Sequence, residues 1–197
     1  SQLPMRRFDS YLPYVPSQKE TWAFIHSFSN PKHKAILSLM YSAGLRVGEV
    51  CALRYEDISR SSMRIHIRHS KARSDRYAIL SRNALDILTQ YWFHAGRPTG
   101  FLFPNRKDPA RPMASYTVNQ FIFAKEKELG LKHQLTCHSF RHAFGTHLYE
   151  NGADLLTIKA LLGHKSLNST AIYVHLASNG ISNAVSPFDR MGGGSLG

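Results

Sequence analysis

The hydrophobic period of this chain is helical almost throughout and changes to a period of two in one segment. Residues 63–68 read MRIHIR, so apolar and basic side chains alternate there, and after the polar turn KARSD the chain continues as RYAIL. Successive side chains of a strand point to opposite faces of a sheet, so this pattern predicts a β-hairpin. The sequence therefore predicts an α+β fold that is predominantly α-helical, with one small antiparallel β-sheet.

Capping residues mark the ends of the predicted helices. Ser17 and Glu20 have the spacing of a capping box, and Asn30 stands before Pro31 at the start of a run that ends at Gly44. A second helix is expected to resume around Leu45. Further starts are predicted at Ser81, Ser115 and Asp154, and further stops at Gly130, Asn151 and Gly163.

A chain of 197 residues suits one domain with a sizeable core. The predicted elements place that domain at residues 17–183. Residues 1–16 are expected to be a linker, and residues 184–197, which end in GGGSLG, a partly flexible tail. No internal repeat is found.

The chain carries a large excess of positive charge. It has 25 Lys and Arg against 13 Asp and Glu, a formal charge of +12. An excess of this size indicates a polyanionic partner, with nucleic acid as the leading candidate, although a basic surface that serves solubility is the alternative. Two cysteines form no disulfide framework and suit a reducing compartment. No apolar run reaches transmembrane length and no signal peptide is found, so a cytoplasmic location without membrane contact is expected.

Residues 138–142, HSFRH, place three basic or protonatable side chains at the start of an apolar helix. At about 100° per residue, Phe140, Phe144 and Leu148 share a stripe that faces a core. His138 and Arg141 project side by side from the neighbouring face. These two side chains are therefore predicted to point at one ligand.

A metal site at His138 and His142 is the alternative for this helix. The zinc-protease pattern requires Glu directly after the first histidine, but Ser139 stands there, and the positive charge of Arg141 between the histidines disfavours a divalent ion. No metal is therefore predicted. Taken singly, each of these residues also has an ordinary structural interpretation, as a surface ion pair, a cap or a packing residue.

Three stretches together resemble the tyrosine recombinase (phage integrase) family. HSFRHAFGTHLYENGADLLTIKALLGHKSLNSTAIYVH, from His138 to His175, contains in order the His-x-x-Arg, LLGH and Tyr motifs of that family. YSAGLRVGEVCALRYEDI resembles its first arginine box. HSKARSDRYAIL resembles its hairpin box, although Ser70 and Ala72 stand where the family commonly has glycines.

The resemblance implies a catalytic domain that cleaves and rejoins DNA strands by transesterification, without a cofactor. It implies that Tyr173 attacks phosphorus to give a 3′-phosphotyrosine and a free 5′-hydroxyl, and that the reaction passes through a Holliday junction. Arg46 and Arg141 would clamp the phosphate. Lys71 would protonate the leaving oxygen, His138 would exchange a proton with Tyr173, and His164 would bond the phosphate. Glu49 would orient Arg46 or a neighbouring histidine.

The same resemblance implies partners and leaves alternatives open. Double-stranded DNA, self-association into a tetramer on DNA and accessory DNA-bending or directionality proteins are expected, with residues 1–16 leading to a separate core-binding domain. Apolar residues of the tail, Ile181, Val185 and Phe188, are candidates for docking on a neighbouring protomer. A type IB topoisomerase-like nicking and closing enzyme and a non-catalytic DNA-binding protein are the alternatives. Five basic residues are candidates for phosphate contacts: Arg64, Arg68, Arg73, Arg76 and Lys165.

Overall fold

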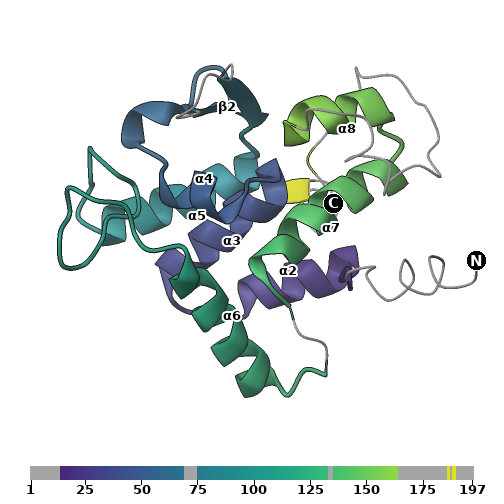
Figure 1. Cartoon of the computed structure of the whole chain (residues 1–197), viewed down its shortest axis with the longest axis horizontal. Helices are drawn as coiled ribbons and strands as arrows, with labels where there is room; N and C mark the ends of the chain where they lie inside the picture. The colour runs from purple at the N-terminus through teal and green to yellow at the C-terminus, as the bar shows by residue number, and fades with distance from the viewer. Residues whose placement is uncertain (1–13, 69–74, 133–134, 164–185, 187, 190–197) are drawn as a thin grey trace, which may run out of the picture.

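The computed structural model describes residues 14–68, 75–132, 135–163, 186, 188 and 189. Within them, seven α-helices surround a core and a three-stranded sheet lies at one end (Figure 1). The elements in chain order are α2 (Gln18–His26), α3 (Pro31–Ala43), α4 (Val47–Cys51), the 3₁₀ turn η1 (Tyr55–Asp57), β1 (Ile58–Ser59), β2 (Arg64–Ile67), β3 (Arg76–Ile79), α5 (Arg82–His94), α6 (Tyr116–Leu129), α7 (Cys137–Glu150) and α8 (Leu155–Leu162). The predicted fold class is confirmed.

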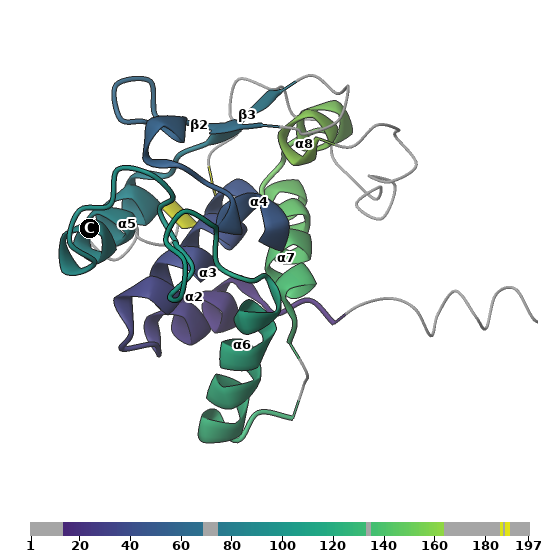
Figure 2. The ribbon, with the colours of Figure 1, turned by 60° about the vertical axis from the view of Figure 1, so that its left-hand side comes forward.

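Helix α3 is the centre of the core. Every residue from 35 to 43 is buried, because α2, α4, α5 and α7 pack around it. A helix that is apolar on all sides can be stable only when it is enclosed in this way. The sheet and α8 lie at one end of the molecule and α6 at the other (Figure 2).

The predicted hairpin is present, with one strand more than the sequence indicated. Strands β2 and β3 are antiparallel with Ile65 opposite Ala78, and the short β1 pairs with the other edge of β2. Ile65 and Ile67 face the core, and Arg64 and His66 face outward, as the alternation predicts. Met63 was expected to continue the strand, but its φ of 53° places it in the turn before β2.

Most of the predicted helix ends are confirmed. Ser17 and Glu20 form the capping box, Asn30 and Asp154 cap α3 and α8, and Gly44, Gly130 and Gly163 end their helices with positive φ. Ser115 differs, because its backbone is already helical and its side chain makes no capping bond. The helix expected around Leu45 begins at Val47, with Arg46 as its N-cap residue.

The C-terminal residues that the structure describes pack on their own chain. Phe188 is fully buried beside Trp22 and Tyr41. The carboxylate of Asp189 accepts hydrogen bonds from the backbone N–H groups of Arg82 and Asn83, each at 3.1 Å, and so caps the N-terminus of α5. Phe188 is therefore engaged within its own chain and not exposed for docking on a neighbouring protomer. The other two residues predicted to dock there, Ile181 and Val185, lie outside the described residues.

His147 lies on the buried face of α7, inside the core. Its Nδ1 accepts a bond of 2.8 Å from the Tyr41 hydroxyl, and its Nε2–H donates to the Pro16 carbonyl at 2.9 Å. This assignment of donor and acceptor belongs to the neutral ring, which burial favours, and both bonds serve the packing of α7 on the core. In the described part of the chain, no helix has the length and hydrophobicity needed to span a membrane.

Gly44→Ala is expected to destabilise the protein far more than Gly130→Ala. Both glycines have positive φ, which costs an alanine about 1 kcal/mol, but a Cβ at Gly44 would also overlap the Phe144 ring and lie 2.8 Å from Leu162 Cδ2, whereas the space at Gly130 is open. With the overpacking added, we expect about 3 kcal/mol for Gly44→Ala. Urea unfolding of both variants measures the difference, and equal losses would show that the core relaxes around the added methyl group.

His147 should make stability depend on pH. Burial lowers the pKa of His147 to about 4, although the bond to Pro16 raises it in part. The unfolded chain, with a histidine pKa of about 6.5, binds the proton first, so stability is lost as the pH falls from about 6.5 toward 4. The loss should reach about 3 kcal/mol. Urea unfolding of wild type and His147→Gln at several pH values should show a smaller loss in the variant, whereas His94→Gln, at an exposed histidine, should keep the wild-type profile.

Candidate active site

A cleft of about 580 Å³ opens where the N-terminal ends of α4 and α7 meet strand β2. Arg46, from the start of α4, lines this cleft together with His138 and Arg141, which lie more than 90 residues further along the chain in the first turns of α7. The other polar residues around it are Glu49, Arg54, Asp57, His66 and Arg68. The structure therefore brings together three of the predicted catalytic residues.

Arg141 is a buried cation with a fixed orientation. Only 8% of it is exposed, and its guanidinium donates to the carbonyls of Gly44, at 2.5 Å, and Leu162, at 2.7 Å. Both carbonyls belong to helix C-terminal ends, where backbone acceptors lack helical partners and the helix dipole is negative. The ends of α3 and α8 therefore hold the guanidinium plane at the wall of the cleft.

The backbone of Arg46 is fixed by a hydrogen bond, and its side chain is exposed to solvent. Its N–H donates to Glu49 Oε1 at 2.9 Å, while its side chain is 44% exposed in the cleft. Its Nη1 lies 3.8 Å from Glu49 Oε2, longer than a hydrogen bond. Arg46 therefore presents a solvent-accessible positive charge beside the buried charge of Arg141.

Glu49 has its strongest side-chain partner in Arg76. Arg76 donates to both carboxylate oxygens, at 2.5 and 3.0 Å, and both side chains are 11% exposed. Burial raises the pKa of Glu49, but the bonds and charge of Arg76, the N–H of Arg46 and the charge of Arg141 together lower it below its ordinary value. Glu49 is therefore an ionised carboxylate behind the two predicted phosphate-binding arginines.

The two histidines at the start of α7 differ in exposure. His138 is exposed at the cleft, in the first turn of the helix, one turn before Arg141. His142 is half-buried, and burial, followed by the charges of His138 and Arg141, lowers its pKa. Among the described residues no group of three or more His, Cys, Asp or Glu side chains is placed to hold a metal ion.

The candidate phosphate-contacting arginines occupy three different environments. Arg64 is exposed on β2. Arg68 is 51% exposed and its Nε lies 2.8 Å from Asp57. Arg76 lies in the interior, in its ion pair with Glu49. Five other predicted site residues lie outside the described residues: Lys71, Arg73, His164, Lys165 and Tyr173.

A second, basic hollow was not foreseen. Lys32, Arg106 and Lys107 line a depression of about 550 Å³ beside the N-terminal end of α6. Burial, then the charge of Arg106, lowers the pKa of Lys32. Lys32 lies more than 70 residues before the adjacent pair Arg106 and Lys107, so the only sequence signals for this hollow were the net charge and the local NRK run.

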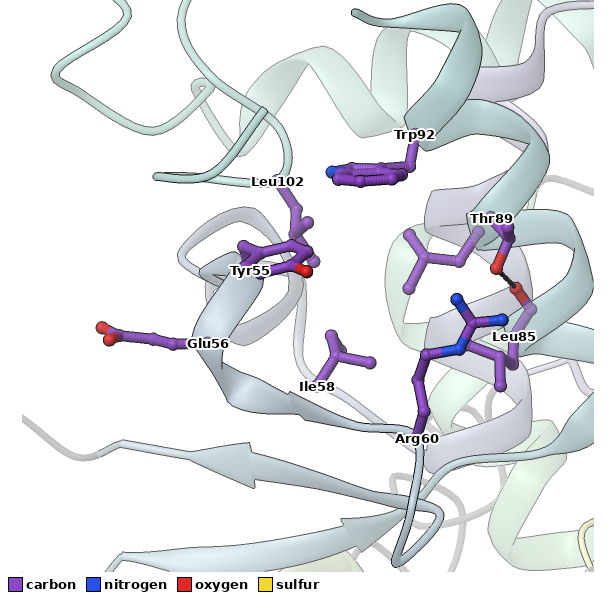
Figure 3. Close-up of a pocket in the computed structure, with 9 residues that line it drawn as sticks. Tyr55, Glu56, Ile58, Arg60, Leu85, Thr89, Trp92 and Leu102 are labelled. Carbon is purple, nitrogen blue, oxygen red and sulfur yellow. Dashed lines mark hydrogen bonds between the residues drawn. The ribbon is translucent and has the colours of Figure 1, made fainter. Parts of the chain in front are cut away.

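A third pocket, of about 260 Å³, is mostly apolar and lies between η1 and α5. The rings of Tyr55 and Trp92 are stacked with centroids 5.5 Å apart, and Arg60 extends along α5 beside Leu85 (Figure 3). None of the predicted catalytic residues lines it. The cleft at Arg46, His138 and Arg141 therefore remains the candidate active site.

Comparison with known proteins agrees with this geometry. The model of the phage integrase family matches residues 18–179. The protein y4eF of Sinorhizobium fredii, named as an integrase/recombinase, is 39% identical over 189 residues, which cover 96% of this chain and 74% of y4eF. The tyrosine recombinase XerA of Pyrococcus horikoshii is 33% identical over 178 residues, 88% of this chain and 61% of that protein.

Solved structures show the same fold. A crystal structure of XerA recombinase superposes with a TM-score of 0.76 at 27% identity, over 95% of this chain and 66% of that one. XerH recombinase bound to its difH substrate has a TM-score of 0.72 at 22% identity, over 84% of this chain and 51% of that one. This chain thus spans only part of the length of these relatives. On the family match, the identities and the shared fold, the chain belongs to the phage integrase family of tyrosine recombinases.

Proposed function

We propose that this chain is the catalytic domain of a site-specific DNA recombinase or integrase. It cleaves and rejoins DNA strands by transesterification, through a 3′-phosphotyrosine intermediate and a Holliday junction. The observation that carries the proposal is the meeting of Arg46, His138 and Arg141 in one cleft. Relatives that are named recombinases and integrases support it.

The two arginines supply the electrostatic part of the chemistry. Attack on a phosphodiester concentrates negative charge on the non-bridging oxygens, and guanidinium groups can bond two oxygens at once. Arg141 is oriented before substrate arrives, because two helix ends hold it, so little reorganisation is needed during the reaction. Arg46, with its exposed side chain, completes the clamp. Together they stabilise the charge that develops on the phosphate.

Tyr173 is the proposed nucleophile. Its phenol oxygen forms the new bond to phosphorus while the bond from phosphorus to the 5′ oxygen breaks. His138 accepts the phenol proton, Lys71 gives a proton to the departing 5′ oxygen, and His164 bonds the phosphate. Rejoining reverses these steps with a 5′-hydroxyl from another strand, so the bond energy is kept and no water is consumed.

Double-stranded DNA is the proposed substrate, and a tetramer of this chain on DNA, with accessory DNA-bending or directionality proteins, the proposed assembly. The exposed Arg64 and Arg68, with Arg73 and Lys165, are proposed to contact backbone phosphates. The basic hollow adds Lys32, Arg106 and Lys107 to this set, because cations gathered in a concave surface suit a polyanion. A cytoplasmic location is proposed with this function.

Tyr173→Phe should abolish covalent attachment to DNA. We would incubate the protein with a library of nicked duplexes of random sequence, in the presence of a chelator, denature it, and map any DNA-linked peptide by mass spectrometry. Wild type and Tyr55→Phe should form an adduct at Tyr173, and His138→Gln should slow adduct formation by about 10²–10⁴-fold. An adduct with Tyr173→Phe would contradict the assigned nucleophile, and DNA binding without any wild-type adduct would favour a non-catalytic DNA-binding protein.

The DNA sequences trapped in the covalent adducts then serve to distinguish recombination from simple nicking and closing. Two labelled duplexes that carry the trapped sequence should yield a four-way junction with wild type. Rejoining of each duplex to itself, with relaxation of a supercoiled plasmid and no junction, would favour the topoisomerase-like alternative.

Replacement of Arg106 and Lys107 by alanine should reduce the salt dependence of DNA binding. Each lost phosphate contact reduces the slope of log K against log salt by about 0.9, so the double variant should lose about 1.8. Fluorescence anisotropy with a short random duplex measures the slope. The control removes two exposed lysines at the other end of α6, Lys127 in its last turn and Lys132 just beyond it, and should keep the wild-type slope. Equal slopes for all three proteins would exclude the hollow from the DNA interface.

A further inference from the structure

Arg76 begins strand β3, five residues after Lys71 in the sequence, and its side chain turns into the molecule, where it is 11% exposed. Its guanidinium makes a two-pronged contact with Glu49 at the start of α4, with Nη1 2.5 Å from Oε2 and Nη2 3.0 Å from Oε1. The planar fork of an arginine matches a carboxylate in this way, whereas a lysine offers one point of charge. Arg76 therefore occupies both oxygens of Glu49.

The other side of Arg76 lies against the end of α8. A Cβ added at Gly163 would lie 2.7 Å from Arg76 Cδ and 2.8 Å from Nε, so the side chain fills the space directly beside this glycine. Gly163 follows Leu162, whose carbonyl accepts the bond from Arg141, and precedes His164. Arg76 thus joins β3, α4 and α8. In the sequence, Lys71 precedes β3, Arg46 precedes α4 and His164 follows the end of α8.

The electrostatic consequence concerns Arg46. Glu49 is ionised, and three cations surround it: Arg76 at 2.5 Å, Arg46 with Nη1 at 3.8 Å, and Arg141, whose charge also acts on it. Without Arg76, Oε2 of Glu49 would lose its close partner in a largely buried site, where an unpaired charge is costly. The guanidinium of Arg46 would need to move by only about 1 Å to replace it at hydrogen-bonding distance, and would then be withdrawn from the cleft.

We propose that Arg76 is a positioning residue that saturates Glu49 and so leaves the guanidinium of Arg46 available to a substrate phosphate. This inference deepens the proposed function and rests on it. It also replaces the expectation that Arg76 itself contacts DNA, because its guanidinium is engaged in the interior.

Four variants test the proposal by the salt dependence of DNA binding: Arg76→Met, Arg46→Ala, the pair Arg46→Ala with Arg76→Met, and the pair Glu49→Gln with Arg76→Met. In the last pair the amide introduced at position 49 has the shape of the carboxylate without its charge, so nothing draws Arg46 away. Arg82→Met, at an exposed arginine on α5, is the control for loss of one charge. The probe is the short random duplex used to test the basic hollow, and circular dichroism confirms that each variant is folded at the temperature of measurement.

The proposal predicts one pattern of slopes. Arg76→Met should lose about 0.9 from the slope, because Arg46 no longer binds a phosphate. Arg46→Ala should lose the same amount. The Arg46→Ala and Arg76→Met pair should lose no more than either single variant, because both changes remove the same phosphate contact. The Glu49→Gln and Arg76→Met pair should regain the wild-type slope. If Arg76 itself contacted a phosphate, the slope of the Glu49→Gln and Arg76→Met pair would stay below that of wild type. The slope of the Arg46→Ala and Arg76→Met pair would then fall by about 1.8. A wild-type slope for folded Arg76→Met would equally overturn the proposal.

The rate of covalent adduct formation gives a second readout. Arg76→Met should slow it by about 10²-fold, the scale expected for a misplaced catalytic group, and the pair with Glu49→Gln should recover most of the rate. Failure of wild type to form an adduct would count against the proposed function, while the slopes would still decide the role of Arg76. A normal wild-type rate together with a normal Arg76→Met rate would overturn only the inference about Arg76.

Discussion

The buried guanidinium of Arg141 is the contact on which the arrangement of the cleft depends. One side chain of α7 joins the C-terminal end of α3, at the Gly44 carbonyl, to the C-terminal end of α8, at the Leu162 carbonyl. Both ends have backbone acceptors without helical partners, and a cation satisfies them better than a neutral donor. The same charge that orients three helices also faces the site where a phosphate is proposed to bind.

A glycine stands at each of the two helix ends that Arg141 joins. Gly44 and Gly163 both have positive φ, and a side chain on either would meet its neighbours, Phe144 and Leu162 for Gly44 and Arg76 for Gly163. The helices can therefore end close to the packed core and to each other. Around this frame the ionised Glu49 lies between Arg46 and Arg76, so the charge balance of the cleft is set in large part by side chains that are mostly buried.

Local patterns in the sequence predicted the elements well, because the signals are local. Ser17, Asn30 and Asp154 cap helices through bonds to residues two or three positions away, and the alternation in MRIHIR depends only on successive side chains. The buried stripe of Phe140, Phe144 and Leu148 follows from the helical period in the same way. Ser115 and Met63 differ from the prediction in their own backbone, which is helical at Ser115 and has positive φ at Met63, and β1, with two residues, is too short to leave a periodic signal.

The sequence by itself determined the helical class and the hairpin, since spacing along one element is visible in one dimension. It also contained the motifs whose resemblance to the family selected Arg46, His138 and Arg141. Only the tertiary structure decided which charges meet. In the sequence, Arg76 is indistinguishable from a basic residue on the exposed face of a strand. In the structure, both of its terminal nitrogens bond the carboxylate of Glu49, 27 positions away, in the interior. The gathering of Lys32 with Arg106 and the burial of Phe188 on its own chain are equally non-local. The physical reason is that Coulomb energy and burial depend on distance in space, and chain folding brings together groups whose separation in sequence carries no pattern.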